Sequence, residues 1–181
     1  MARRSNECSR CLMLFLPILF VVGACAAPAP SSFSSGGPQT AEARQDQILH
    51  GRALVVSHAC GGCHGGGDNP AAAGWLDGMR DTLIQRFRVG PFVTRPKNLT
   101  PDNTTGTGRF SERQIFNALR YGLRPEETQD VEITPMVPGQ GNFPLPPPYL
   151  APPMPWPSRP NLSGQELFAL PPHLKDGPNP R

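Results

Sequence analysis

Five consecutive residues, Cys60-Gly61-Gly62-Cys63-His64, contain the C-x-x-C-H spacing that is typical of covalent haem attachment. Two thiols at this spacing can reach the two vinyl groups on one edge of a porphyrin and form thioether bonds with them. The following residue, His64, is placed to bring an imidazole nitrogen beneath the iron. The pattern therefore predicts one covalently bound haem c, held by Cys60 and Cys63, with His64 as an axial ligand of the iron.

Paired cysteines also serve three other chemistries, which the sequence supports less well. A thioredoxin-like dithiol places its C-x-x-C beside a βαβ unit, and no such unit is apparent. A zinc site needs further ligands at finger-like spacing, which His50, His58 and His173 do not supply. A disulfide closing so short a loop would constrain the chain little. A second cysteine pair, Cys8 and Cys11, lacks a following histidine and is assigned no haem.

The second axial ligand decides between electron transfer and ligand binding, because an occupied sixth position excludes small molecules from the iron. The methionines Met79, Met136 and Met154 and the spare histidines are candidates. Met79 follows His64 by only 15 residues, on a stretch that must begin to wrap the ring. The prolines around Met154 form a stiffer frame than those around Met136, and stiffness favours a weak thioether bond. We predict that Met154 is the ligand, with Met136 as the alternative.

Three helices are predicted around these residues. Residues 41–59 carry apolar side chains at roughly helical spacing, and Thr40 can serve as the N-cap. A capping box at residues 111–114 begins a helix that ends near Gly122, and a second box at residues 163–166 begins a shorter one. There are no alternating strand-like runs of useful length. The predicted fold class is all-α with long irregular loops.

Long segments of the chain have no clear helical pattern. Residues 75–97 are compatible with a short helix or an irregular wrap. Residues 125–181 contain 16 of the 24 prolines, and residues 135–160 cannot form a regular helix or a central strand. A loop of this length is unusual in a compact domain. A rigid cofactor around which the loop wraps would account for it.

The first 24 residues have the features of an export signal. Three arginines (Arg3, Arg4 and Arg10) precede the apolar run Leu12–Val22, which is shorter than the roughly 20 residues of a membrane-spanning helix. The sequence Val22-Gly23-Ala24-Cys25 then resembles a bacterial lipobox, in which Cys25 becomes the lipidated N-terminal residue. Cleavage after Ala26 or Ala27 is the alternative and would release a soluble protein.

The predicted organisation follows from these boundaries. Residues 1–24 form the signal peptide, residues 25–40 a flexible tether rich in Ala, Pro, Ser and Gly, and residues 41–178 the folded domain. From position 25 onward, 14 Lys and Arg face 13 Asp and Glu, so the exported chain is nearly neutral. The whole chain has only 2 lysines and no basic run, which argues against nucleic acid as a partner.

Three segments together carry a family resemblance: CGGCH, NLTPDNTTGTGRFSERQIFNALRYG and PPMPWP. They resemble the class I type of bacterial cytochrome c, and most of all the exported monohaem domains related to cytochrome subunits of periplasmic dehydrogenases. The resemblance covers roughly residues 45–177. It implies a cytochrome c-like fold of three to four helices around one haem, with His64 and Met154 on opposite sides of the iron.

This resemblance implies a one-electron carrier rather than an enzyme, on the periplasmic side of the membrane. The implied partners are redox proteins such as a dehydrogenase, an oxidase or another cytochrome. The lipobox-like segment adds the membrane as a partner, through a lipid on Cys25. Two alternatives stay open. The chain is the electron-accepting cytochrome subunit of a periplasmic dehydrogenase complex, or it binds small molecules at the haem if Met154 is not a ligand.

The resemblance also assigns roles to smaller features. It implies that Asn98 and Thr100 lie near the haem edge and bond its propionates, although the same residues fit a simple turn with Pro101 at its bend. Gly51 matches the small residue at which the first and last helices of such cytochromes cross.

Two features depart from the family pattern. In the last helix, Pro171 and Pro172 interrupt a run that is usually continuous, so we predict that this helix ends near Leu170. His173 then occupies the usual aromatic position. The second departure is the proline-rich insert, residues 125–148, for which the sequence suggests no role beyond a docking surface.

Overall fold

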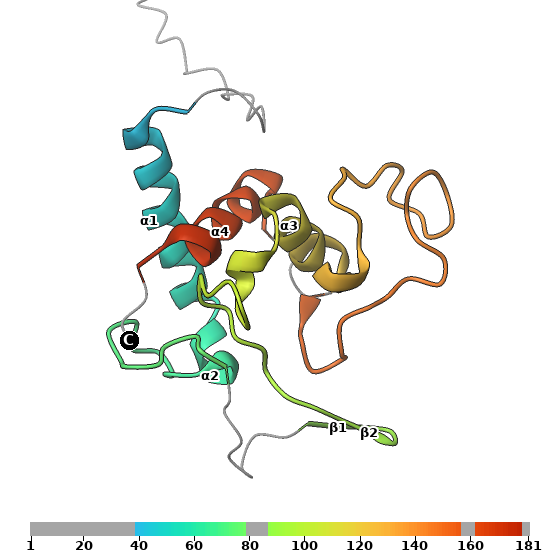
Figure 1. The fold of residues 1–181 in the computed structure, drawn as a ribbon, viewed down its shortest axis with the longest axis horizontal. Helices are drawn as coiled ribbons and strands as arrows, with labels where there is room; N and C mark the ends of the chain where they lie inside the picture. The colour runs from blue at the N-terminus through green and yellow to red at the C-terminus, as the bar shows by residue number, and fades with distance from the viewer. Residues whose placement is uncertain (1–38, 79–86, 157–161, 179–181) are drawn as a thin grey trace, which may run out of the picture. The chain divides into compact units, whose positions relative to one another are not determined.

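The computed structural model describes residues 39–78, 87–156 and 162–178, all within one compact unit. The predicted signal peptide, the lipid site Cys25 and Met79 lie outside these residues. No helix in the described ranges combines the length and apolarity needed to cross a membrane. The elements in chain order are α1 (Ala41–Ser57), α2 (Cys60–His64), β1 (Phe87–Val89), β2 (Phe92–Thr94), η1 (Thr107–Arg109), α3 (Glu112–Tyr121), η2 (Pro125–Glu127) and α4 (Gly164–Asp176) (Figure 1).

The predicted helix boundaries are confirmed at four points. The Thr40 side chain accepts a hydrogen bond from the backbone N–H of Ala43, 3.2 Å away, and so caps α1. Both predicted capping boxes form, with Ser111 at the start of α3 and Ser163 at the start of α4. Helix α3 ends at Gly122, which has the left-handed φ of 70° that glycine adopts without strain. These local signals are sufficient because each cap joins residues only three or four positions apart.

The main core lies where α1 and α3 pack against α4. Helices α1 and α4 cross at Gly51, where a Cβ atom would lie 2.1 Å from the backbone oxygen of Ala169. The predicted role of Gly51 as the small residue of a close helix crossing is thus confirmed. Helix α3 meets α4 through stacked rings of Phe116 and Phe168, whose centroids are 4.2 Å apart. The buried members of this core are Val55, Trp75, Leu76, Ile115, Phe116, Leu119, Leu162, Leu167, Leu170 and Leu174.

The last helix is longer than predicted. Helix α4 does not end near Leu170 but continues through Pro171 and Pro172, both fully buried. Pro172 has no N–H to donate to the carbonyl of Phe168, one turn earlier. Instead, the Nε2 of Gln47 in α1 donates to that carbonyl at 3.0 Å. The predicted end was wrong because a side chain from another helix supplies a donor that the proline lacks.

Replacing Gln47 should therefore test how α4 tolerates its prolines. We expect Gln47→Ala to lower the free energy of unfolding by about 1–3 kcal/mol, because the Phe168 carbonyl loses its donor. In a Pro172→Ala background the restored backbone N–H takes over this carbonyl, and the same change should cost less than about 1 kcal/mol. A double-mutant cycle by denaturant unfolding measures the difference. Equal costs in both backgrounds would show that the bond does not compensate for Pro172.

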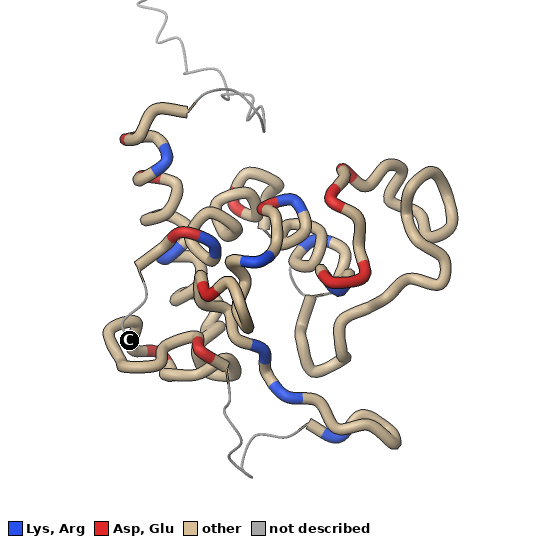
Figure 2. The backbone as a smooth tube through the Cα atoms, viewed as in Figure 1, with Lys and Arg blue, Asp and Glu red and all other residues tan. Residues whose placement is uncertain are grey.

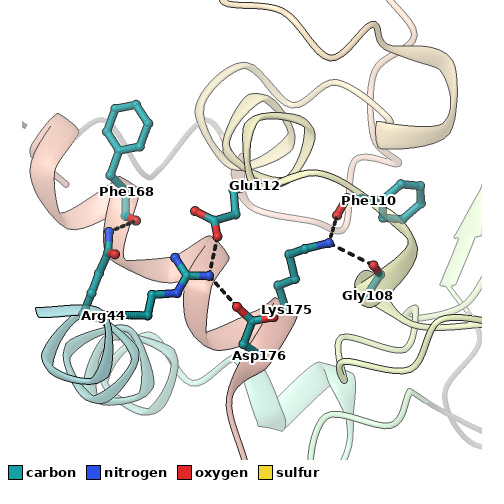
Figure 3. Close-up of polar contacts among 8 residues, drawn as sticks. Arg44, Gly108, Phe110, Glu112, Phe168, Lys175 and Asp176 are labelled. Carbon is teal, nitrogen blue, oxygen red and sulfur yellow. Dashed lines mark hydrogen bonds and ion pairs between the residues drawn. The ribbon is translucent and has the colours of Figure 1, made fainter. Parts of the chain in front are cut away.

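Ionic and polar contacts tie the end of α4 to the rest of the fold. Figure 3 shows the Arg44 guanidinium of α1 bonded to the carboxylates of both Glu112 in α3 and Asp176 in α4. On the same helix end, the Lys175 ammonium donates to the carbonyls of Gly108 and Phe110, at 3.0 and 2.8 Å (Figure 3). Helices α1 and α3 and η1 therefore meet at the last turn of α4, beyond the two prolines.

The proline-rich insert packs against α3 and has a small core of its own. Gln114 of α3 donates through Nε2 to the carbonyls of Pro125 and Thr128, at 3.1 and 3.0 Å. This side chain of α3 thus holds the start of the insert and helps to order the long loop. The second core contains Leu123, Ile133 and Phe143, with Tyr121 packed against it.

Residues 75–97 contain a feature that was not predicted. Strands β1 and β2 form an antiparallel hairpin around Gly90 and Pro91, with Val89 opposite Phe92. Residues 75–78 form turns, and residues 79–86 lie outside the described chain. Each strand has three residues, which is too short for an alternating pattern to stand out from the sequence.

Candidate functional site

The C-x-x-C-H residues form the short helix α2. Residues three and four positions apart lie on the same side of a helical turn, so α2 brings Cys60, Cys63 and His64 to one face. Cys60 is half-buried against the main core and Cys63 is exposed, and neither takes part in a disulfide. Ala59, with a left-handed φ of 50°, separates α2 from α1. The chain thus turns sharply just before the two thiols.

The ring of His64 is oriented by a distant backbone group. Its Nδ1 lies 2.7 Å from the carbonyl oxygen of Lys97, which is 33 positions away in the sequence. A carbonyl can only accept, so Nδ1 must carry the proton. In the neutral imidazole the lone pair is then on Nε2, the nitrogen that would ligate a metal. Sequence reasoning missed Lys97 because a backbone carbonyl carries no side-chain signal.

The two glycines between the cysteines have different surroundings. A Cβ atom at Gly61 would lie 2.1 Å from the Gly67 oxygen and 2.7 Å from Nε1 of Trp75. A Cβ atom at Gly62 would meet nothing within 4 Å. The first position therefore needs glycine so that α2 can pack on the Trp75 indole, and the second does not.

This difference gives a matched pair of variants. We expect Gly61→Ala to lower the yield of protein that carries the predicted haem at least severalfold, because the clash with the Gly67 backbone displaces the turn that carries both thiols. Gly62→Ala should leave that yield unchanged. Haem staining of a denaturing gel, normalised to total protein, compares the two variants. Similar losses in both would contradict the packing argument.

Asn98 and Thr100 lie in a turn that follows the Lys97 carbonyl. The Oδ1 of Asn98 accepts from the Thr100 N–H at 2.8 Å, and its Nδ2 donates to Oγ1 of Thr105 at 2.9 Å. The Thr100 side chain is buried. These bonds support a turn-forming role for both residues. Their predicted bonds to haem propionates stay a prediction.

Met154 and Met136 occupy different environments. Met154 is half-buried and packs against the same core as Cys60, whereas Met136 is 60% exposed in the insert. The Met154 N–H donates to the Ala151 carbonyl at 2.9 Å, and its carbonyl accepts from the Trp156 N–H at 2.8 Å. The Trp156 ring covers Gly122, where a Cβ atom would lie 2.3 Å from it. The segment with Met154 is thus held in a turn against the end of α3.

His173 lies at the crossing of α1 and α4 and is 3% exposed. Its ring packs against the indole of Trp75, with centroids 5.9 Å apart. Burial first, and the charge of Arg52 second, lower the pKa of His173 from 6.5 to about 4. The neutral imidazole therefore serves as an aromatic core residue, in the position where the sequence predicted one.

This buried histidine should make stability depend on pH. The unfolded chain binds a proton at His173 below pH 6.5, whereas the folded chain does so only near pH 4. The free energy of unfolding should therefore fall between pH 6.5 and 4, by on the order of 2 kcal/mol. His173→Phe should remove this part of the slope, and His50→Phe, at an exposed position of α1, should not. Denaturant unfolding at pH 7 and pH 4.5 measures the change in the free energy of unfolding. An equal change in His173→Phe and His50→Phe would contradict the assignment of this pH dependence to His173.

The arrangement fits the chemistry of a covalent haem. The face of α2 presents two thiols, the proton on Nδ1 of His64 leaves the Nε2 lone pair for a metal, and the core that receives Cys60 also receives Met154. Comparison with protein-family models, curated proteins and solved structures finds no match for this chain. What the site does must therefore be inferred from the chemistry of its own residues.

Proposed function

We propose that the chain is an exported monohaem c-type cytochrome that carries single electrons between redox proteins. The observation that carries this proposal is the 2.7 Å bond from Nδ1 of His64 to the Lys97 carbonyl, beside two thiols on the same helix face. A structural zinc site needs four ligands, and in the described residues no group of three or more His, Cys, Asp and Glu side chains is placed to hold a metal ion. A redox dithiol has no need of an imidazole held in this way next to the second cysteine. An axial haem ligand does need it.

The residues of α2 would hold the haem. Cys60 and Cys63 bind it through thioethers, so that it stays attached even to a small exported domain. The Lys97 carbonyl keeps the His64 ring in one orientation and makes Nε2 a stronger donor, which is the usual effect of such outer contacts on metal-bound histidines. The backbone around Lys97 therefore acts as a positioning group.

Met154 would complete the axial ligands on the other side. The haem supplies iron that alternates between Fe(II) and Fe(III), and the choice of ligands sets its potential. The turn between Ala151 and Trp156 restrains the Met154 thioether, which is a weak ligand that stays bound only when it is held in place. With Met154 as the second ligand of the iron, the protein would transfer electrons and would not bind small molecules.

Location and partners complete the proposal. The signal-like segment and Cys25 support export and a lipid anchor on the periplasmic side of a bacterial membrane. A dehydrogenase, an oxidase or another cytochrome would exchange electrons with the haem. These assignments rest on the sequence alone.

The proposal is tested on the protein exported from a host that attaches haem to C-x-x-C-H sites. We expect haem staining to persist on a denaturing gel, a redox titration that follows a single one-electron wave, and no rapid binding of CO to the reduced protein. A stained band that binds CO quickly would instead indicate an open sixth position. The absence of stained haem would refute the proposal.

A further inference from the structure

The β1–β2 hairpin has an apolar tip on an element that makes little contact with the helices (Figure 1). In the antiparallel register Val89 lies opposite Phe92 and Arg88 opposite Val93. Opposite residues point to the same face of a hairpin, so Val89 and Phe92 share one face and Arg88 and Val93 share the other. Phe92 is 72% exposed and Val93 is 53% exposed.

The hairpin and the irregular segment that follows it are positively charged. Between positions 87 and 97 there are three basic residues, Arg88, Arg95 and Lys97, and no acidic residue. Figure 2 shows these basic positions along the segment. Their side chains are exposed. An apolar tip with positive charge behind it is complementary to a negatively charged surface that also has an apolar interior.

The size of the tip favours a lipid surface over a protein. A stable protein interface buries about 800 Å² on each partner, which is more than a two-residue turn and its neighbours present. A membrane interface needs only a few inserted apolar side chains together with basic side chains at the headgroups. At roughly 3.3 Å per residue, Arg88 lies about 7 Å behind the turn at Gly90. That distance matches the roughly 5–10 Å depth of interfacial insertion.

We propose that this hairpin is a membrane-surface anchor that binds anionic lipids. Phe92, beside the turn, enters the boundary between headgroups and acyl chains. Arg88 and its cross-strand partner Val93 lie at the level of the headgroups. The charges of Arg95 and Lys97, farther from the tip, add attraction to the anionic surface. The binding itself does not depend on the haem. Strand β2 ends three residues before Lys97, whose carbonyl holds His64. Through this short connection, the anchor also sets which side of the candidate site faces the membrane.

Vesicle sedimentation tests the anchor without the lipid on Cys25. The chain from residue 26 onward is produced behind a cleavable secretion signal and mixed with vesicles of phosphatidylcholine, with or without phosphatidylglycerol. We expect sedimentation with the anionic vesicles only. Phe92→Ser should weaken this binding at least about tenfold, because a large apolar side chain is no longer buried. Arg88→Gln should weaken it about fivefold.

Leu145→Ser is the matched control. Leu145 is 74% exposed, like Phe92, but lies in the insert, which contains acidic residues and no basic residue. We expect this variant to bind as the unmodified chain does. Circular dichroism of the same samples shows whether each variant is folded, and haem staining shows whether it carries haem. A chain that stains for haem but does not bind vesicles would therefore contradict the anchor alone.

Three results would overturn the proposal. The first is equal binding to neutral and anionic vesicles. The second is an equal loss of binding in Leu145→Ser and Phe92→Ser. The third is retention on a polyglutamate resin that Arg88→Gln abolishes and Phe92→Ser preserves, which would indicate an acidic protein partner instead.

Discussion

Replacing both Cys60 and Cys63 by serine is expected to abolish haem staining of the protein on a denaturing gel. Each thioether needs a thiol, and the two thiols lie on the same face of α2. A single replacement leaves one attachment point and should lower the stained fraction without removing it. The measurement is haem staining divided by the amount of protein detected with an antibody. We expect the double variant to fall to background.

Cys25→Ser provides the matched cysteine control. The sequence predicts a lipid and no haem on this residue, so its replacement should leave haem staining unchanged and should abolish metabolic labelling of the protein with a lipid precursor. His64→Ala should retain the thiols but lose the axial imidazole, giving an altered haem spectrum. Full staining of the double variant at Cys60 and Cys63 would disprove covalent attachment through this motif.

Replacing Met154 by alanine is expected to have the second large effect. The methionine-to-iron charge-transfer band should disappear, because the core-packed thioether of Met154 is the proposed second ligand of the iron. The midpoint potential should fall, since methionine ligation raises the potential of a c-type haem. The reduced variant should then bind CO rapidly. Absorbance spectra of the oxidised protein and CO difference spectra of the reduced protein measure both effects.

Met136→Ala is the control for this assignment. Met136 is 60% exposed in the insert, so its removal should leave the band, the potential and CO binding as they are in the unmodified protein. The reverse outcome, with the band lost in Met136→Ala and kept in Met154→Ala, would exchange the two assignments. Circular dichroism of both variants distinguishes loss of a ligand from loss of the fold.

Much of the helical structure was predictable because its signals are local. Thr40, Ser111 and Ser163 each cap a helix through bonds to residues three positions away, and Gly122 ends α3 with a left-handed backbone. The thiols and the imidazole of the C-x-x-C-H motif are equally local, since five residues place them on one helical turn. Such features depend on interactions between residues that are close together in the sequence, so the local order of residue types is sufficient to predict them.

The errors arose where distant groups decide the outcome. The continuation of α4 through Pro172 depends on Gln47, more than a hundred positions earlier. The short hairpin has too few residues for a pattern. Neither feature could be predicted from its own segment. The donor that allows α4 to continue lies in α1, and the strands of the hairpin are too short to show a pattern.

For the candidate site, the sequence named the residues and the tertiary structure supplied their surroundings. The motif identified Cys60, Cys63 and His64, and the stiffer proline frame favoured Met154 over Met136 as the second ligand. Burial favours the same residue, since Met154 packs against the main core and Met136 faces solvent. Likewise, the Lys97 carbonyl orients His64 only because the fold brings backbone from 33 positions away. Hydrogen bonds of this kind depend on distances in space, which no local pattern of residues encodes.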